Sequence, residues 1–408
     1  MGRTVHTLPT PWERVWTVKR SVSVHPRETG PENPRSDVSD TAAHEEPELI
    51  QLLTPEGELT EHPDYPLDIS AEEIRALYRD LVLVRRVDSE AVSLQRQGEL
   101  GLWASLLGQE AAQIGSGRAL RPKDMAFPSY REHGVAWCRG IEPKELLGMF
   151  RGVTNGGWDP HEHGFHLYTI VIGSQALHAT GYAMGVQRDG AVGEDGTAVI
   201  SYFGDGATSQ GDTNEAFNFA AVNNAPVVFF CQNNQWAISE PLERQARVPI
   251  YRRAAGFGFP GMRVDGNDVL ACLAVTRAAL DNARTGNGPT LVEAFTYRMG
   301  AHTTNDDPTR YRDAAELDEW KAKDPILRVR RHLELYELAD EAFFARIDEE
   351  SDEVGEQVRT QCRSMADPEP LDIFHEVYAE PNVHIDRQRS EFADYLASFE
   401  GAGAEGGR

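Results

Sequence analysis

The sequence predicts an α/β fold in which a parallel sheet is flanked by helices. Three observations predict this fold. Apolar runs at 197–203, 226–231 and 289–297 are typical of buried strands, a helical pattern at 212–224 separates the first two runs, and glycine turns alternate with these segments. A strand, a crossover helix and a second strand are the repeating unit of parallel sheets. We therefore expect the helix to cross one face of the sheet.

The first long helix is predicted near residue 70. Ser70 and Glu73 have the spacing of a capping box, in which each side chain accepts a hydrogen bond from the other residue's backbone. Apolar residues then recur at helical spacing at Ile74, Leu77 and Leu81. Ordered structure is therefore expected from about residue 67.

Changes in composition predict four regions along the chain. Residues 1–66 are polar and contain several prolines, which indicates a disordered or loosely ordered extension. The α/β domain is expected at 67–330, and an acidic, helical region that contacts a partner at 331–395. The glycine-rich residues 396–408 are expected to form a disordered tail.

Charge and cysteine content exclude several classes of protein. The 408 residues carry a formal net charge of −25, which disfavours binding to nucleic acid or to an anionic membrane. This acidity fits a soluble surface, although it is also compatible with a high-salt habitat. No apolar run is long enough to span a membrane. Four widely spaced cysteines predict no disulfide framework, so we expect a cytoplasmic protein.

Two polar motifs follow neighbouring strands of the predicted sheet. Asp205 lies between the glycines of "YFGDGATSQGD" (202–212), and Asn234 lies in "QNNQWAIS" (232–239). The carboxyl ends of parallel strands gather ligands at one edge of a sheet. A carboxylate there repels phosphate unless a cation lies between them, and oxygen ligands of this kind suit Mg²⁺. Each motif alone is a common turn or cap, but their spacing favours a metal site.

These motifs resemble a known family. GDG followed by NN is similar to the thiamine diphosphate motif. Together with "FPSYREHG" and "YRMGAHTTNDDPTRYR", it makes residues 67–395 resemble the alpha subunits of the decarboxylating component of 2-oxoacid dehydrogenases. The branched-chain enzyme is the nearest likeness and pyruvate dehydrogenase the next. The resemblance implies a thiamine diphosphate-binding fold with a helical C-terminal extension.

The resemblance also implies a role for each matching residue. It implies that the side chains of Asp205 and Asn234 and the backbone carbonyl of Trp236 ligate Mg²⁺. Some of these residues are expected to let the backbone approach the diphosphate closely, and others are expected to contact the cofactor with their side chains. The first set is Gly204, Gly206 and Ala207, and the second is Tyr130, Arg131, Ser174, Arg298 and His302.

His302 is the expected catalytic residue. In the resembling family this histidine reaches the thiazolium side of the cofactor and assists transfer of the acyl group. Thr303 stands where some eukaryotic relatives carry a phosphorylated serine, and the charged stretch 306–312 resembles a loop that orders over the cofactor. Gln232 is a departure, because some relatives have a phosphate-contacting arginine there; it puts the affinity for the cofactor in question.

The resemblance further implies partners and a substrate. The glutamate that activates the cofactor belongs to a beta subunit in two-subunit relatives. No feature of this sequence distinguishes a candidate glutamate, although Glu110 lies in an ordered-looking region. We therefore expect an α₂β₂ heterotetramer that decarboxylates a branched-chain 2-oxoacid and passes the acyl group to a lipoyl acyltransferase core.

Other interpretations remain open at this point. Pyruvate is the alternative substrate, and an acetoin-cleaving or transketolase-like enzyme would share the metal motif. A regulatory subunit without activity would retain the fold. The histidines of "HEHGFH" (161–166) fit no standard zinc spacing, and a polar loop is the simpler interpretation.

Overall fold

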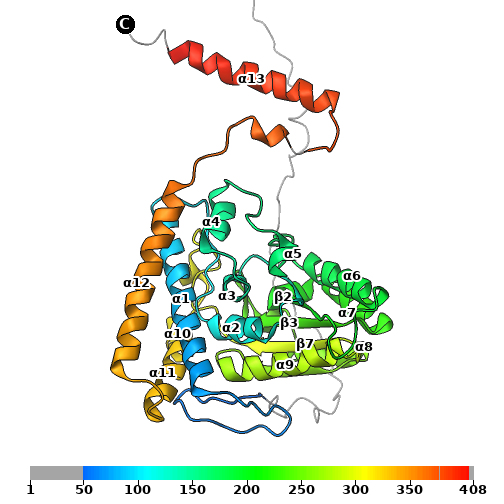
Figure 1. Cartoon of the computed structure of the whole chain (residues 1–408), viewed down its shortest axis with the longest axis vertical. Coiled ribbons are helices and arrows are strands. Elements are labelled where there is room, and N and C mark those ends of the chain that lie inside the picture. The colour runs from blue at the N-terminus through cyan, green and yellow to red at the C-terminus, as the bar shows by residue number, and fades with distance from the viewer. Residues whose placement is uncertain (1–48, 376, 404–408) are drawn as a thin grey trace, which may run out of the picture. The chain divides into compact units, whose positions relative to one another are not determined.

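The computed structural model describes residues 49–375 and 377–403, and these contain a central five-stranded sheet (Figure 1). The strand order is β1-β2-β3-β7-β6, and every neighbouring pair is parallel. The three predicted strands correspond to β2, β3 and β7, which lie side by side. The α/β fold with a parallel sheet is confirmed. The strands are β1 Met125–Phe127, β2 Val199–Gly204, β3 Val227–Asn233, β6 Gly261–Asp265 and β7 Thr290–Phe295.

Helices cover both faces of this sheet. Alternate residues of a strand point to opposite faces. In β2, Ile200 and Tyr202 join one core with helices α1, α2 and α9, whereas Val199 and Phe203 join a second core with α6, α7 and α8. The predicted helix at 212–224 is α7, the crossover between β2 and β3. These helices are α1 Ala71–Arg96, α2 Glu110–Ala119, α6 Ser174–Arg188, α7 Gly211–Asn223, α8 Arg253–Phe257 and α9 Val269–Arg284.

Helix α1 begins as the sequence predicts. The Glu73 backbone N–H donates to Ser70 Oγ at 3.2 Å, and the Ser70 N–H donates to Glu73 Oε2 at 2.8 Å. The predicted apolar positions Ile74, Leu77 and Leu81 are buried. The capping box and the apolar face therefore fix both the start and the orientation of α1.

Ordered structure begins earlier than the boundary expected at residue 66. The backbone of Ile50 pairs with β6, donating to Arg263 O and accepting from Asp265 N, both at 3.0 Å. The backbone N–H groups of Leu52 and Leu53 donate to Asp268 Oδ2 at 2.7 and 2.6 Å, and both side chains are buried. The open edge of β6 therefore holds this short apolar segment. Residues 1–48 lie outside the described residues.

The C-terminal region is helical, as predicted. Helix α12 packs along α1, which joins this region to the α/β domain. Residues 396–403, which were expected in the disordered tail, continue helix α13, and residues 404–408 lie outside the described residues. In the described part of the chain, no helix is long and apolar enough to span a membrane. The helices are α10 Ala314–Lys321, α11 Pro325–Leu335, α12 Glu341–Ser364 and α13 Val383–Gly403.

Several short elements complete the described part of the chain. Helices α3 and α4 follow β1, and a small antiparallel hairpin follows β3. The α-helices are α3 His133–Cys138, α4 Pro143–Arg151 and α5 Pro160–His163, and the hairpin strands are β4 Trp236–Ala237 and β5 Glu240–Pro241. The 3₁₀-helices are η2 Asp205–Ser209, η3 Leu242–Arg244, η4 Ile250–Arg252, η5 Pro308–Arg310 and η6 Asp372–Phe374.

Candidate active site

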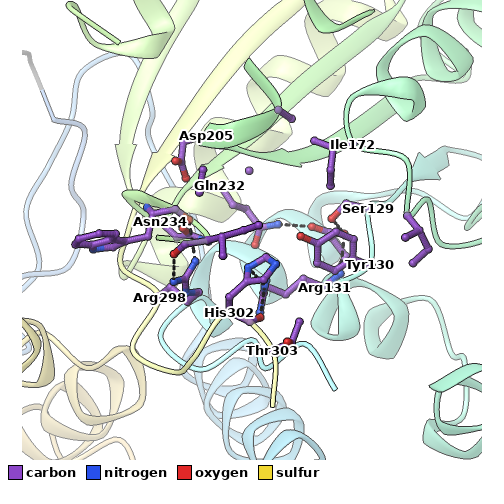
Figure 2. A pocket seen from close by; sticks show the side chains of 18 of the residues that line it. Ser129, Tyr130, Arg131, Ile172, Asp205, Gln232, Asn234, Arg298, His302 and Thr303 are labelled. Atoms are coloured by element: carbon purple, nitrogen blue, oxygen red, sulfur yellow. Dashed lines mark hydrogen bonds between the residues drawn. The ribbon is translucent and has the colours of Figure 1, made fainter. Parts of the chain in front are cut away.

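A cavity of about 780 Å³ lies where β2, β3 and β7 end (Figure 2). Gly204 pairs with Gln232 in the register of β2 and β3, so the two predicted motifs leave the sheet beside each other. Ten of the eleven predicted site residues line this cavity. They are Tyr130, Arg131, Gly204, Asp205, Gly206, Ala207, Asn234, Trp236, Arg298 and His302.

Asp205 is a buried carboxylate without a cationic partner. Its side chain is 1% exposed, and Oδ2 accepts a hydrogen bond from Gln245 Nε2 at 3.0 Å. Among the described residues, Asp205 forms no ion pair. Burial raises its pKa to about 6, partly offset by the Gln245 hydrogen bond. Because an unpaired buried carboxylate is costly, this position favours a cation.

Asn234 is oriented by two hydrogen bonds. Its Nδ2 donates to Gln109 Oε1 at 3.1 Å, and its Oδ1 accepts from the Trp236 backbone N–H at 3.2 Å. Asn233 instead donates to Glu293 Oε1 at 2.7 Å and is fully buried. The two asparagines therefore differ in role: Asn234 lines the cavity, while Asn233 fastens β3 to β7.

Arg298 is a buried cation that forms no ion pair with any described residue. Its guanidinium donates to the carbonyl oxygens of Trp236 and Ile238 at 2.8 and 2.7 Å, and to Tyr311 Oη at 3.0 Å. Its Nε has no partner in the described structure, and the side chain is fully buried. Burial, with the nearby charge of Arg131, lowers the pKa of Arg298 to about 10. A bound anion would compensate this charge.

The glycine turn after β2 leaves room for close approach. A Cβ atom on Gly206 would lie 2.8 Å from the Ala237 Cβ, so only glycine allows η2 and the β4 hairpin to lie this close. Gly204 and Ala207 line the cavity on either side of Asp205 and Gly206. The chain therefore offers a backbone surface beside the carboxylate.

Arg131 and His302 form the other side of the site. Arg131 Nη2 lies 3.3 Å from His302 Nδ1 and donates to the His302 carbonyl at 2.7 Å. Because arginine only donates, Nδ1 must accept, and the proton of the neutral ring is then on Nε2. Burial, with the charges of Arg131 and Arg298, lowers the pKa of His302 to about 4. The Tyr130 ring meets the His302 ring edge-on at 6.1 Å.

Ser174 is the predicted residue that does not line the cavity. Its hydroxyl donates to the Val171 carbonyl at 2.8 Å, at the start of α6. Its neighbour Gln175 lines the cavity instead. Gln175 Nε2 donates to Tyr202 O at 3.0 Å, and its buried Oε1 has no partner among the described residues. The sequence thus located this wall of the cavity but not the side chain that faces it.

Gln232 belongs to a buried polar network that includes Glu132. Gln232 Nε2 donates to Glu132 Oε1 at 2.7 Å, and its Oε1 accepts from Gln113 Nε2 at 3.0 Å. Glu132 also accepts from Ser129 Oγ at 2.8 Å, and burial raises its pKa. Glu132 makes no ion pair within the described residues. Sequence reasoning missed its role, although it lies in the quoted motif "SYREHG".

Apolar side chains form another wall of the cavity, and no sequence pattern predicted this wall. Figure 2 shows Ile172 across the cavity from Arg298. The side chains of this wall come from two separate loops and from helix α4, so no local pattern joins them. They are Leu102, Met149, Phe150, Ile170 and Ile172.

The other residues considered from the sequence lie elsewhere. Glu110 does not line the cavity, because its carboxylate pairs with Arg85 at 2.7 Å and accepts from the Gly108 N–H at 2.9 Å. His166 stacks on Phe127 at 4.8 Å, and His163 contacts the Arg139 carbonyl. Within the described ranges, no group of three or more His, Cys, Asp or Glu side chains is placed to hold a metal.

Comparison with known proteins assigns the chain to a family. Residues 78–370 match the family described as "Dehydrogenase E1 component". The chain is 45% identical over 351 residues to the "3-methyl-2-oxobutanoate dehydrogenase subunit alpha" of Mycobacterium tuberculosis, covering 86% of this chain and 95% of that protein. It is 39% identical over 289 residues to the "Pyruvate dehydrogenase E1 component subunit alpha" of Staphylococcus aureus, covering 70% of this chain and 77% of that protein.

Proposed function

Because this chain belongs to the dehydrogenase E1 component family, we propose that it is the alpha subunit of a 2-oxoacid dehydrogenase whose substrate is a branched-chain 2-oxoacid. The single observation that carries the proposal is the charge pattern of the cavity. It contains a buried carboxylate, Asp205, and a buried guanidinium, Arg298, and within the described ranges neither group forms an ion pair. A divalent ion and a diphosphate, bound together, would compensate both charges.

The residues present fit thiamine diphosphate with Mg²⁺. Asp205 and Asn234, with the Trp236 carbonyl, would hold the metal through oxygen atoms, which are the ligands that Mg²⁺ prefers. Gly204, Gly206 and Ala207 would let the backbone lie against the diphosphate. Bound thiamine diphosphate would supply the nucleophilic carbon and the electron sink needed to release CO₂ from a 2-oxoacid.

Cationic and aromatic side chains would complete the contacts to the cofactor. Arg298 would balance the charge of the diphosphate from the metal end of the cavity. Tyr130 and Arg131 would lie beside it, near His302. Ser174 remains a prediction, and Gln175 is the side chain of that wall which lines the cavity.

His302 would act as a neutral hydrogen-bond donor. With Nδ1 facing Arg131 at 3.3 Å, its Nε2–H is left to donate to an oxygen of the bound substrate or product. The low pKa keeps the ring neutral at physiological pH. His302 would thus hold a proton at a defined atom while the acyl group leaves for its acceptor.

Partners are part of this proposal. Relatives carry the name "subunit alpha". Among the described residues, the glutamate that lines the cavity is Glu132, and its carboxylate already accepts hydrogen bonds from Ser129 and Gln232. We therefore infer a beta subunit in an α₂β₂ heterotetramer, and a lipoyl acyltransferase core as acyl acceptor. The four cysteines are free thiols, which agrees with a cytoplasmic location.

Pyruvate is the second candidate substrate, because pyruvate dehydrogenase alpha subunits are also among the relatives. The apolar wall favours the larger, branched side chain: each additional buried CH₂ contributes about 0.8 kcal/mol. The test is the ratio of kcat/KM for 3-methyl-2-oxobutanoate and pyruvate, measured on the chain reconstituted with its beta subunit. We expect a preference of roughly 10- to 200-fold for the branched acid. A preference for pyruvate would contradict this choice, and no turnover of any 2-oxoacid would contradict the enzymatic proposal.

A further inference from the structure

Asp88 is a buried carboxylate that lies outside the cavity. It belongs to α1, its side chain is 2% exposed, and it makes no ion pair among the described residues. Three donors converge on it. Trp103 Nε1 donates at 2.8 Å, Ser105 Oγ at 2.6 Å and the Leu106 backbone N–H at 3.0 Å. One carboxylate therefore fixes the loop segment 103–107, which joins α1 to α2.

Segment 103–107 in turn holds the loop that carries His302. The Thr304 backbone N–H donates to the Trp103 carbonyl at 2.9 Å, and the Trp103 N–H donates to Thr304 Oγ1 at 3.0 Å. On the other side of His302, the Met299 N–H donates to the Leu107 carbonyl at 3.0 Å. The histidine loop is thus fastened to this segment both before and after His302.

The same segment also fixes Arg131. Arg131 Nη1 donates to the Ser105 carbonyl at 2.5 Å, while Nη2 donates to the His302 carbonyl at 2.7 Å. The guanidinium therefore bridges segment 103–107 and the histidine loop. Displacement of Ser105 would move Arg131 away from His302 Nδ1.

We propose that Asp88 is a positioning residue: through segment 103–107 it holds His302 and Arg131 in the geometry that directs His302 Nε2 into the cavity. This inference rests on the role of His302 in the proposed function. The three residues that donate hydrogen bonds to Asp88 do not line the cavity. Asp88 therefore affects the cavity only through these three donors.

Asp80 provides a matched control within the same helix. It is also 2% exposed and also accepts a hydrogen bond from an indole, Trp137 Nε1, at 2.9 Å. Its other partners among the described residues are Arg118, whose Nε and Nη2 each lie 2.7 Å from Asp80 Oδ2, and Arg79, whose Nη1 lies 3.9 Å from Asp80 Oδ1. Neither Trp137 nor Arg118 lines the cavity or contacts the histidine loop. A loss of buried hydrogen bonds at Asp80 should therefore destabilise the fold without disturbing His302.

The first test is hydrogen exchange in the complex with the beta subunit, without cofactor. In Asp88→Asn the NH₂ group of the carboxamide faces residues that are themselves hydrogen-bond donors, so hydrogen bonds to segment 103–107 are lost. We therefore expect faster exchange of the backbone amides of residues 299–304 than in the wild type. Asp80→Asn should leave exchange there unchanged. Ser105→Ala, which removes one of the three donors, should give a smaller increase at the same residues. Unchanged exchange at 299–304 in Asp88→Asn would overturn the inference.

The second test is the pH dependence of kcat in the same complex. Asp88→Asn should lower kcat by up to about 100-fold, because a misplacement of about 1 Å caused by a mutation far from the reacting atoms can cost that much. It should also move the acid limb of the profile to higher pH. Asp80→Asn should lower the Tm about as much as Asp88→Asn does, but it should change neither kcat nor the position of the acid limb. An unmoved acid limb in Asp88→Asn, or an equal loss of kcat in Asp80→Asn, would overturn the inference. A wild-type complex without decarboxylase activity would instead overturn the proposed function, and the exchange result would still decide the structural role of Asp88.

Discussion

Arg131 Nη2 lies 3.3 Å from His302 Nδ1 and donates to the His302 carbonyl at 2.7 Å, so one guanidinium fixes both the ring and the backbone of this histidine. A permanent cation at Nδ1 disfavours protonation of the ring and determines which nitrogen carries its proton. The contact therefore specifies a neutral histidine with Nε2–H free for the cavity. It also gives Arg131 a role besides the predicted contact with diphosphate.

The pH dependence of activity should show this neutral histidine. Burial first, and then Arg131 and Arg298, lower the pKa of His302 to about 4, against about 6.5 for an ordinary histidine. The active neutral form should then persist to about pH 5, and activity should fall only below that value. The measurement is kcat against pH on the complex with the beta subunit.

Removal of the Arg131 charge should change this profile in one direction. Arg131→Gln should raise the pKa of His302, so the acid limb should move toward higher pH. Arg310→Gln, an exposed change on the nearby loop, should leave the limb in place. An acid limb near pH 6.5 in the wild type, or no movement in Arg131→Gln, would contradict the assignment.

Asp205→Asn should separate stability from cofactor binding. Because the carboxylate is buried without a cation, its replacement by a neutral amide should keep or raise the Tm of the cofactor-free protein. The same change should weaken binding of thiamine diphosphate with Mg²⁺ by about 10- to 100-fold or more. Asp212→Asn, an exposed change at the start of α7, should alter neither. Equal cofactor affinity in Asp205→Asn and wild type would exclude Asp205 as a ligand.

Gly206→Ala tests the close approach of η2 to the β4 hairpin. The new Cβ would lie 2.8 Å from the Ala237 Cβ, so the hairpin that carries Trp236 must shift. We expect a stability loss of about 1–3 kcal/mol, typical of overpacking, together with weaker cofactor binding. Gly211→Ala, where a Cβ meets nothing within 4 Å, is the matched control. A Gly206→Ala protein with wild-type stability and cofactor affinity would show that neither property depends on the close approach of η2 to the β4 hairpin.

Two opposite substitutions at Gln232 test how charge in the polar network affects the cofactor. Gln232 Nε2 lies 2.7 Å from Glu132 Oε1, so Gln232→Glu places two carboxylates in contact and should weaken diphosphate binding and lower the Tm. Gln232→Arg adds a cation beside the cavity and should strengthen binding. Calorimetric affinities on the assembled complex would check both. Changes of the same sign would show that packing, rather than charge, governs this position.

The part of the site predicted from sequence is the part built by local structure. The β2, α7 and β3 segments are contiguous, and the register that pairs Gly204 with Gln232 brings Asp205 and Asn234 to one cavity. Apolar periodicity and a strand-helix-strand connection are sufficient to predict this. The GDG and NN spacing then adds the chemistry.

The remaining parts depend on contacts between distant residues. Gln245 bonds Asp205 across 40 residues, and Gln109 bonds Asn234 across 125, and no sequence pattern marks either one. The segment at 49–53 was missed for the same reason, since its partners Arg263 and Asp268 lie more than 200 residues away. Ser174 and Gln175 show a third limit: the sequence located the start of α6, but the rotation of the helix decides which side chain faces the cavity.

The most direct test of the account is the affinity of the assembled α and beta subunits for thiamine diphosphate, measured by calorimetry with and without Mg²⁺. If Asp205 and Asn234 hold a cation that bridges to the diphosphate, saturable binding should require Mg²⁺ in the wild type, and Asp205→Asn should lose that requirement together with most of its affinity. Equal binding in the presence and absence of Mg²⁺, or no binding by the wild-type complex, would contradict it.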